Sequence, residues 1–207
     1  LNLARDLQME GFWKANNIEI IGVDIAAVDI TEDREQFRKL MEKIDIPQCR
    51  SRIAESLLDA KEIAQELGGL PFVIRPSFTL GGTGGGIVWT EEEFERKVLR
   101  GLELSPVHQV LIEESIFGWK EFELELLRDK NDNVVIICTG ENVDPLGVHP
   151  GDSVTVAPSQ TLTDKQFQML RDAAIRMMRS IGTFAGGCNV QFAVEPGTDH
   201  FRAIEIN

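Results

Sequence analysis

A run of five glycines in six positions, from Gly81 to Gly86, restricts the possible folds of this chain more than any other feature. Apolar segments suited to β-strands lie on both sides of it, at 71–75 and 87–89, so the sequence predicts a hairpin with a glycine-rich connection. Glycines have no Cβ to keep a ligand away, and their exposed N–H groups can close on phosphate oxygens. No Gly-Lys-Ser/Thr follows, which excludes a P-loop. The pattern favours a mobile flap laid over a triphosphate, and a merely flexible surface loop is the alternative.

Two arginines are candidates for contacting the same phosphates. Arg75 ends the strand before the glycines, where a fixed guanidinium can be aimed at an anion. An ordinary surface ion pair is the competing interpretation. Arg34 lies in the first turn of a helix predicted over 32–44, with Thr31 as its N-cap. Spacing alone favours a surface position for Arg34.

Amide and carboxylate side chains gather on one face of a hairpin predicted near the C-terminus. Glu205 and Asn207 are two residues apart on a predicted strand, so their side chains face the same way. Gln191 lies on the preceding strand, with Asn189 in phase beside it. Hard oxygen donors of this kind suit Mg²⁺ that bridges phosphates. A solvent-facing polar sheet surface is the alternative, and the glycine run weakens it.

Two further segments combine apolar and polar residues in patterns found at binding sites. The stretch 110–121 can form a crossing strand that offers backbone groups and apolar side chains to a base, with a carboxylate for a ribose. An ordinary strand without a ligand explains it as well. The segment 142–153 concentrates Asp144, His149 and Ser153 in a loop with prolines and glycines, and such loops are often functional.

The order of predicted elements indicates an α+β (α/β) chain in three parts. Residues 1–44 contain helices at 3–13 and 32–44 and a strand at 19–22, and are interpreted as the remnant of a preceding α/β module. Residues 45–113 form a small lid module that carries the glycine hairpin. Residues 114–207 form a larger antiparallel-sheet module with a helix over 164–181. The helical pattern is already present at Leu1, and the last predicted strand runs directly up to Asn207. We therefore expect both ends of the chain to be cut.

Bulk properties exclude several classes of protein. The formal net charge of −13 argues against a nucleic-acid partner or an acidic membrane surface. The three cysteines form no CxxC pair and are odd in number, which is unlike a disulfide framework and favours a cytoplasmic location. No apolar run approaches the roughly 20 residues that a spanning helix needs.

Taken together, these segments closely resemble the large subunits of carbamoyl phosphate synthetases, a family of ATP-grasp ligases. The resemblance covers nearly the whole chain. Its matching strings are EDREQF (32–37), IRPSFTLGGTGGG (74–86), IEESIFGWKEFELE (112–125), RDKNDN (128–133), ENVDPLGVHPGDSVTVAPSQTLTDKQ (141–166), GGCNVQFAV (186–194) and IEIN (204–207). It implies an ATP-grasp fold, and the glycine run with the 141–166 string is similar to the first, bicarbonate-phosphorylating half of such subunits.

The resemblance also implies roles for individual residues. The nucleotide contacts that it implies are Arg34, Arg75, Gly81, Gly82, Glu114, Ile116, Glu121, Gly147, Val148, His149, Gln191 and Glu205. Gln191, Glu205 and Asn207 are implied ligands of a pair of Mg²⁺ or Mn²⁺ ions, and Glu121, Asn142, Asp144 and Ser153 resemble a K⁺ site. Arg75, Glu205 and Asn207 are the implied catalytic residues, because they neutralise charge on the transferring phosphoryl group.

The implied reaction is phosphorylation of bicarbonate by ATP to carboxyphosphate. Ammonia from a glutaminase small subunit then gives carbamate, which a second ATP-grasp half phosphorylates to a product used in arginine and pyrimidine synthesis. Biotin carboxylase, another ATP-grasp ligase, is the alternative, and the 141–166 string argues against it. The family continues beyond Asn207 into an Asn-Pro-Arg segment, so the expectation of activity applies to the parent enzyme and not to these 207 residues alone.

Overall fold

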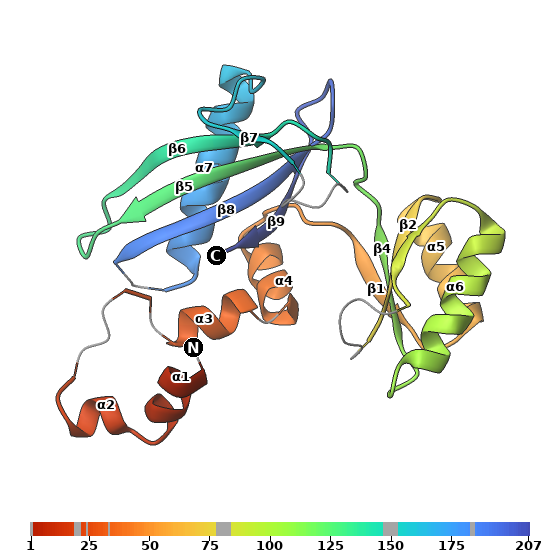
Figure 1. Cartoon of the computed structure of the whole chain (residues 1–207), viewed down its shortest axis with the longest axis horizontal. Helices are drawn as coiled ribbons and strands as arrows, with labels where there is room; N and C mark the ends of the chain where they lie inside the picture. Colours follow the sequence, from red (N-terminus) through yellow and green to blue (C-terminus); the bar gives the residue numbers. More distant parts are fainter. Residues whose placement is uncertain are drawn as a thin grey trace. The chain divides into compact units, whose positions relative to one another are not determined.

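The computed structural model describes residues 2–18, 22–23, 25–32, 34–77, 84–146, 153–182 and 185–207, without the side chains of residues 2, 32, 34 and 35. Its contacts divide the chain into two compact units: Cys49–Phe117 on one side, and Leu1–Gln48 together with Gly118–Asn207 on the other (Figure 1). The boundaries of the three predicted parts, at 44/45 and 113/114, stay a prediction.

The Cys49–Phe117 unit is a four-stranded antiparallel sheet with two helices. Its strands are β1 (Ser51–Ala54), β2 (Phe72–Pro76), β3 (Gly86–Val88) and β4 (Val110–Glu114), in the order β1-β4-β2-β3. The helices are α5 (Leu57–Leu67) and α6 (Glu91–Leu104). Phe72 and Ile74 on β2 and Phe94 and Val98 on α6 are almost fully buried in one core. The hairpin predicted around the glycine run is confirmed, because β2 and β3 pair with Phe72 opposite Val88.

The other unit is built on a five-stranded antiparallel sheet. Its strands are β5 (Lys120–Arg128), β6 (Val134–Asn142), β7 (Thr155–Val156), β8 (Gly186–Val194) and β9 (Phe201–Ile206), in the order β7-β6-β5-β8-β9. Helix α7 (Asp164–Ser180) crosses one face of this sheet (Figure 1). Phe122 and Leu124 on β5, Phe192 on β8 and Met177 on α7 share its core. The predicted α+β class is therefore confirmed.

Among the described residues four short helices precede these sheets; the last agrees with the helix predicted over 32–44, and the earlier ones differ from the prediction. They are α1 (Asn2–Met9), α2 (Phe12–Ala15), α3 (Ile25–Glu32) and α4 (Arg34–Lys43). The helix predicted over 3–13 is interrupted, because Gly11 has a φ of 71° and begins α2 in the left-handed region. Thr31 is not an N-cap: it lies inside α3, where its hydroxyl donates to the Val28 carbonyl. Most of the strand predicted at 19–22 falls outside the described residues.

Helices α6 and α7 begin at threonine caps, and the start of α7 agrees with the helix predicted over 164–181. The Thr163 hydroxyl caps α7 by accepting from the Gln166 N–H, and the Gln166 side-chain oxygen accepts in turn from the Thr163 N–H. Thr90 caps α6 by accepting from the Glu93 N–H at 3.2 Å. Within the part of the chain that is described, no helix has the length and apolar character that crossing a membrane requires.

Candidate functional site

One face of the five-stranded sheet is apolar and faces α7, and the opposite face carries the polar side chains of β5 together with exposed apolar ones such as Leu127. On β5 the side chains of Phe122, Leu124 and Leu126 are buried in the core. Glu121, Glu123 and Glu125 alternate with them, so they project from the opposite face. We call this the oxygen face of the sheet.

The predicted amide and carboxylate residues of β8 and β9 lie on this same oxygen face. Gln191 pairs directly with Glu205 across the two strands. Asn189 and Asn207 exchange both backbone hydrogen bonds at 2.8 Å, so their side chains are also neighbours. The Asn207 amide donates to Glu205 Oε1 at 3.1 Å. Glu205 and Asn207 are exposed, whereas Gln191 is half-buried.

Asn189 links the β8 part of the face to the glutamates of β5. Its side-chain Nδ2 donates to Glu125 Oε1 at 2.8 Å and to Glu123 Oε2 at 3.3 Å. Its Oδ1 is buried and has no hydrogen-bond partner among the described residues. An unpaired buried acceptor is costly, and it is satisfied when a donor or a cation approaches. The sequence placed Asn189 in phase with Gln191, but it gave no sign of the bridge to β5.

The charge on the oxygen face is strongly negative. Glu121, Glu123, Glu125 and Glu205 form no ion pair with a lysine or arginine in the described ranges. Acidic, histidine and cysteine side chains alone do not converge into a metal site in those ranges. A cation here would therefore need the amide oxygens of Gln191 and Asn207 in addition to the Glu205 carboxylate, and all three are hard donors suited to Mg²⁺.

The residues predicted to hold K⁺ are partly brought together at the β6 end of the face. The Asn142 Nδ2 donates to Glu121 Oε2 at 2.9 Å, and both residues are buried. The Thr155 hydroxyl donates to Asn142 Oδ1. Ser153 Oγ is buried without a partner among the described residues. Asp144 is half-buried, and no contact places its carboxylate with the other three.

Glu141, which the sequence did not single out, fixes the segment between β7 and α7. Its Oε2 accepts from the N–H groups of Gln160 at 2.8 Å and Thr161 at 2.9 Å, and its Oε1 accepts from the Thr161 hydroxyl. The Lys120 ammonium lies 3.6 Å from it. Burial raises the pKa of this carboxyl, but the hydrogen bonds from Thr161 and Gln160 and the charge of Lys120 outweigh burial, so the net pKa is lowered.

In the Cys49–Phe117 unit Arg75, the arginine predicted to contact phosphate, forms an ion pair with a glutamate. Arg75 Nη2 donates to Glu113 Oε1 at 3.1 Å on the neighbouring strand, and the Arg75 side chain is 44% exposed. Glu114 pairs with Arg50 at 2.8 Å, and Ile116 is buried. Gly81, Gly82, Gly147, Val148, His149 and the side chain of Arg34 lie outside the described residues.

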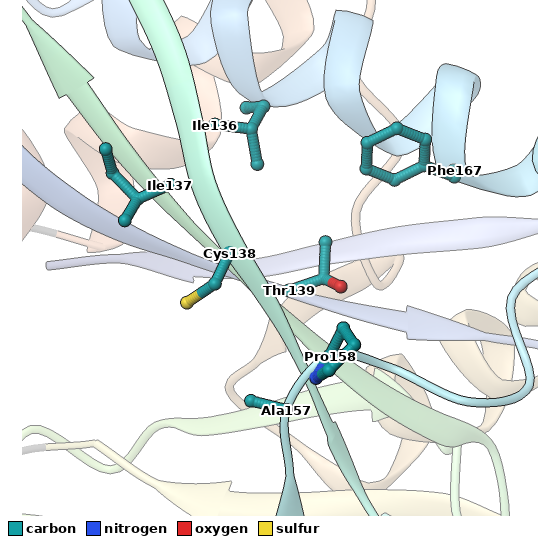
Figure 2. A pocket seen from close by; sticks show the side chains of 7 residues that line it. All are labelled: Ile136, Ile137, Cys138, Thr139, Ala157, Pro158 and Phe167. Atoms are coloured by element: carbon teal, nitrogen blue, oxygen red, sulfur yellow. The ribbon is translucent and has the colours of Figure 1, made fainter.

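A surface hollow lies next to β6 and contains none of the predicted site residues. Its volume is about 440 Å³. Figure 2 shows the side chains that line it, which are mainly apolar: Ile136, Ile137, Cys138, Thr139, Ala157, Pro158 and Phe167. Its apolar lining is unsuited to a charged phosphate, so the oxygen face is the stronger candidate for nucleotide chemistry.

Comparisons with known proteins identify the family that this chain resembles. The family model described as "Carbamoyl-phosphate synthase L chain, ATP binding domain" matches residues 33–207. The carbamoyl phosphate synthase large chain of Synechocystis sp. is 51% identical over 207 residues, which are 100% of this chain and 19% of that relative.

Two solved structures are similar in fold. The biotin carboxylase of Campylobacter jejuni in a "beta-gamma-ATP" complex gives a TM-score of 0.76 at 20% identity, over 99% of this chain and 46% of that one. The D-alanyl-alanine synthetase A of Vibrio cholerae gives 0.73 at 16% identity, over 96% and 62%. At these identities the likeness concerns the fold alone, and it confirms the ATP-grasp fold predicted from the sequence.

Proposed function

The chain belongs to the family of carbamoyl phosphate synthase large chains, and from that premise we propose that it binds ATP with divalent cations and phosphorylates bicarbonate. The observation that carries this proposal is the oxygen face, where Gln191 and Glu205 are paired across β8 and β9 and Asn207 follows in phase. The relatives are about five times longer than this chain, which spans 19% of the Synechocystis protein. The activity is therefore proposed for the parent enzyme.

We propose that Gln191, Glu205 and Asn207 hold a pair of Mg²⁺ or Mn²⁺ ions. The donor set fits such ions, because it consists of oxygens from one carboxylate and two amides on adjacent strands. The unpaired Oδ1 of Asn189 next to them also fits a cation in this region. When bound, these ions would neutralise charge on the phosphates of ATP. The β-sheet holds the protein donors in fixed positions, so little reorganisation is needed during transfer.

The K⁺ assignment rests on fewer contacts. We propose that Glu121, Asn142, Asp144 and Ser153 hold the ion, since Glu121 contacts Asn142 and the Ser153 hydroxyl is buried without a partner in the described ranges. Carboxylate, amide and hydroxyl oxygens are hard donors that suit an alkali cation.

In the Cys49–Phe117 unit, Arg75 is proposed to contact phosphate together with the glycines, including Gly81 and Gly82. Its ion pair with Glu113 is consistent with this, because the pair leaves 44% of the arginine side chain exposed and holds the guanidinium against a side chain of β4. Glu114 and Ile116 are proposed contacts of the nucleoside. Arg34, Gly147, Val148 and His149 remain proposed nucleotide contacts on the resemblance alone.

The proposed chemistry is attack of a bicarbonate oxygen on the γ-phosphorus of ATP, which breaks the bond to the β-phosphate oxygen and releases ADP. Phosphoryl transfer of this kind depends mainly on charge neutralisation and positioning, so we assign no general base. Carboxyphosphate then requires ammonia, for which a glutaminase small subunit is the proposed source, and a second ATP-grasp half. We also propose that these 207 residues alone do not make carbamoyl phosphate.

Biotin carboxylase remains the alternative enzyme, because its structure shares the fold. The 51% identity to a carbamoyl phosphate synthase, against 20% to the biotin carboxylase, favours the first proposal.

The test is ADP release by the full-length large chain that carries this sequence, with bicarbonate or biotin added. We expect bicarbonate to stimulate ADP release, biotin to have no effect, and Arg75→Ala to abolish the stimulation. ADP release that depends on biotin, or that bicarbonate does not stimulate, would overturn the proposal.

A further inference from the structure

The described residues of the glycine run, 84–86, pack against one side of helix α6. Lys97, Gly101 and Leu104 are spaced four and three residues apart, so they share one side of the helix. A Cβ on Gly84 would lie 2.6 Å from Leu104 Cδ1, and a Cβ on Gly86 would lie 2.7 Å from Lys97 Nζ. Both glycines also have positive φ, 79° and 140°. Residues 84 and 86 thus pack directly against the ends of the Leu104 and Lys97 side chains, and their positive φ favours glycine at both positions.

Lys97 forms a hydrogen bond with the backbone of residues 84–86. Its Nζ donates to the Gly85 carbonyl at 3.1 Å in a partly buried position. Lys97 has no carboxylate partner among the residues that the structure describes. Its positive charge is therefore not cancelled locally, and it lies against the backbone of the glycine run.

We propose that Lys97 is a positioning residue that fixes the C-terminal end of the glycine run and thereby strengthens ATP binding. Glycines lose more conformational freedom on ordering than other residues, so a run of them is held weakly by its own backbone. An ammonium bound to the Gly85 carbonyl restricts residues 84–86 before a ligand arrives, and prior restriction strengthens binding. This inference rests on the proposed function, because it assumes that the glycine run contacts phosphate.

The anchoring can be tested without any ligand. In Lys97→Met, backbone hydrogen exchange at Gly84 to Val88 should become at least about tenfold faster, which is the lower end of the effect of losing one hydrogen bond to a charged donor. Lys97→Arg keeps the charge and the donor, and should stay close to the parent rate. Arg96→Met removes the same charge from an exposed neighbouring position on α6 and should leave exchange at these residues unchanged. Equal exchange in Lys97→Met and the parent would overturn the anchoring role.

The functional consequence is measured in the full-length large chain. We expect Lys97→Met to raise KM for ATP about tenfold while kcat changes less than about twofold, since the residue is proposed to order the binding segment and not to contact reacting atoms. Lys97→Arg should recover most of the affinity, and Arg96→Met should behave as the parent. Faster exchange with an unchanged KM would refute the inference and leave the proposed function standing. A parent protein without affinity for ATP would refute the proposed function itself.

Discussion

Replacing Glu141 by Gln tests whether the buried carboxylate holds the segment after β7 in place. Glu141 is 5% exposed, and it accepts from two backbone N–H groups and one hydroxyl of residues 160 and 161. Glutamine keeps one carbonyl oxygen but carries no charge. Its NH₂ group replaces the other oxygen, so there it meets a donor instead of accepting a hydrogen bond. Hydrogen bonds to charged groups contribute about 1.5–3 kcal/mol each and neutral ones about 1 kcal/mol. A loss of about 0.5–2 kcal/mol at each of the three should therefore destabilise this unit by about 1.5–6 kcal/mol.

The effect of pH on this variant has a definite sign. The folded-state pKa of Glu141 is lowered from its ordinary value of 4.5, so the charged carboxylate contributes stability that is fully present above that value. The contribution is lost as the pH falls through the lower folded-state pKa. The difference between the parent and Glu141→Gln should thus be complete at neutral pH and should shrink in acid.

Hydrogen exchange of the buried β5 and β8 amides at Leu124 and Val190 reports the opening of this sheet. Asp172→Asn, at a side chain that is 69% exposed, removes one charge from the same unit and is the control. A Glu141→Gln protein as stable as the parent at neutral pH would refute the reasoning. So would a stability difference that grows as the pH falls.

Two further substitutions test packing and capping. Thr163→Ala removes the cap of α7 and should cost about 1 kcal/mol, seen as faster exchange in the first turn of the helix. Thr163→Ser should retain most of that stability. Gly101→Ala would place a methyl group 2.6 Å from Val110 Cγ1 and 3.3 Å from Pro76 Cγ, so it should destabilise the Cys49–Phe117 unit by about 1–3 kcal/mol in urea unfolding. No loss of stability would mean that this helix contact is looser than described.

Local sequence patterns predicted the parts of the fold that local physics decides. The helix predicted over 164–181 depends on contacts within four residues, and the oxygen face depends on the two-residue period of a strand, so both are readable from the chain. Thr31 failed as a cap because residues 25–32 are helical, and nothing in its own neighbourhood distinguishes a cap from the end of another helix.

Contacts between distant residues could not be predicted in the same way. Glu113 reaches Arg75 only because β4 pairs with β2, 38 residues away along the chain. The irregularity opposite Glu125 and Leu126 shifts the phase of β6, so alternation along that strand does not reveal that Glu141 faces inward. Asn189 was in phase with Gln191, but its bridge to Glu123 and Glu125 depends on the register of β8 with β5.

The most direct test of the central claim is the Mg²⁺ dependence of ATP binding at the oxygen face. A non-hydrolysable ATP analogue is titrated into the full-length large chain by calorimetry, with and without Mg²⁺, for the parent, Glu205→Gln and the exposed control Glu103→Gln. Glu205→Gln replaces a charged ligand by a neutral one of the same shape. We predict that it loses at least about tenfold of the Mg²⁺-dependent gain in affinity, or about 1.4 kcal/mol, while the control keeps all of it. A Glu205→Gln protein with the full Mg²⁺-dependent gain would contradict the assignment of the oxygen face as the metal and nucleotide site.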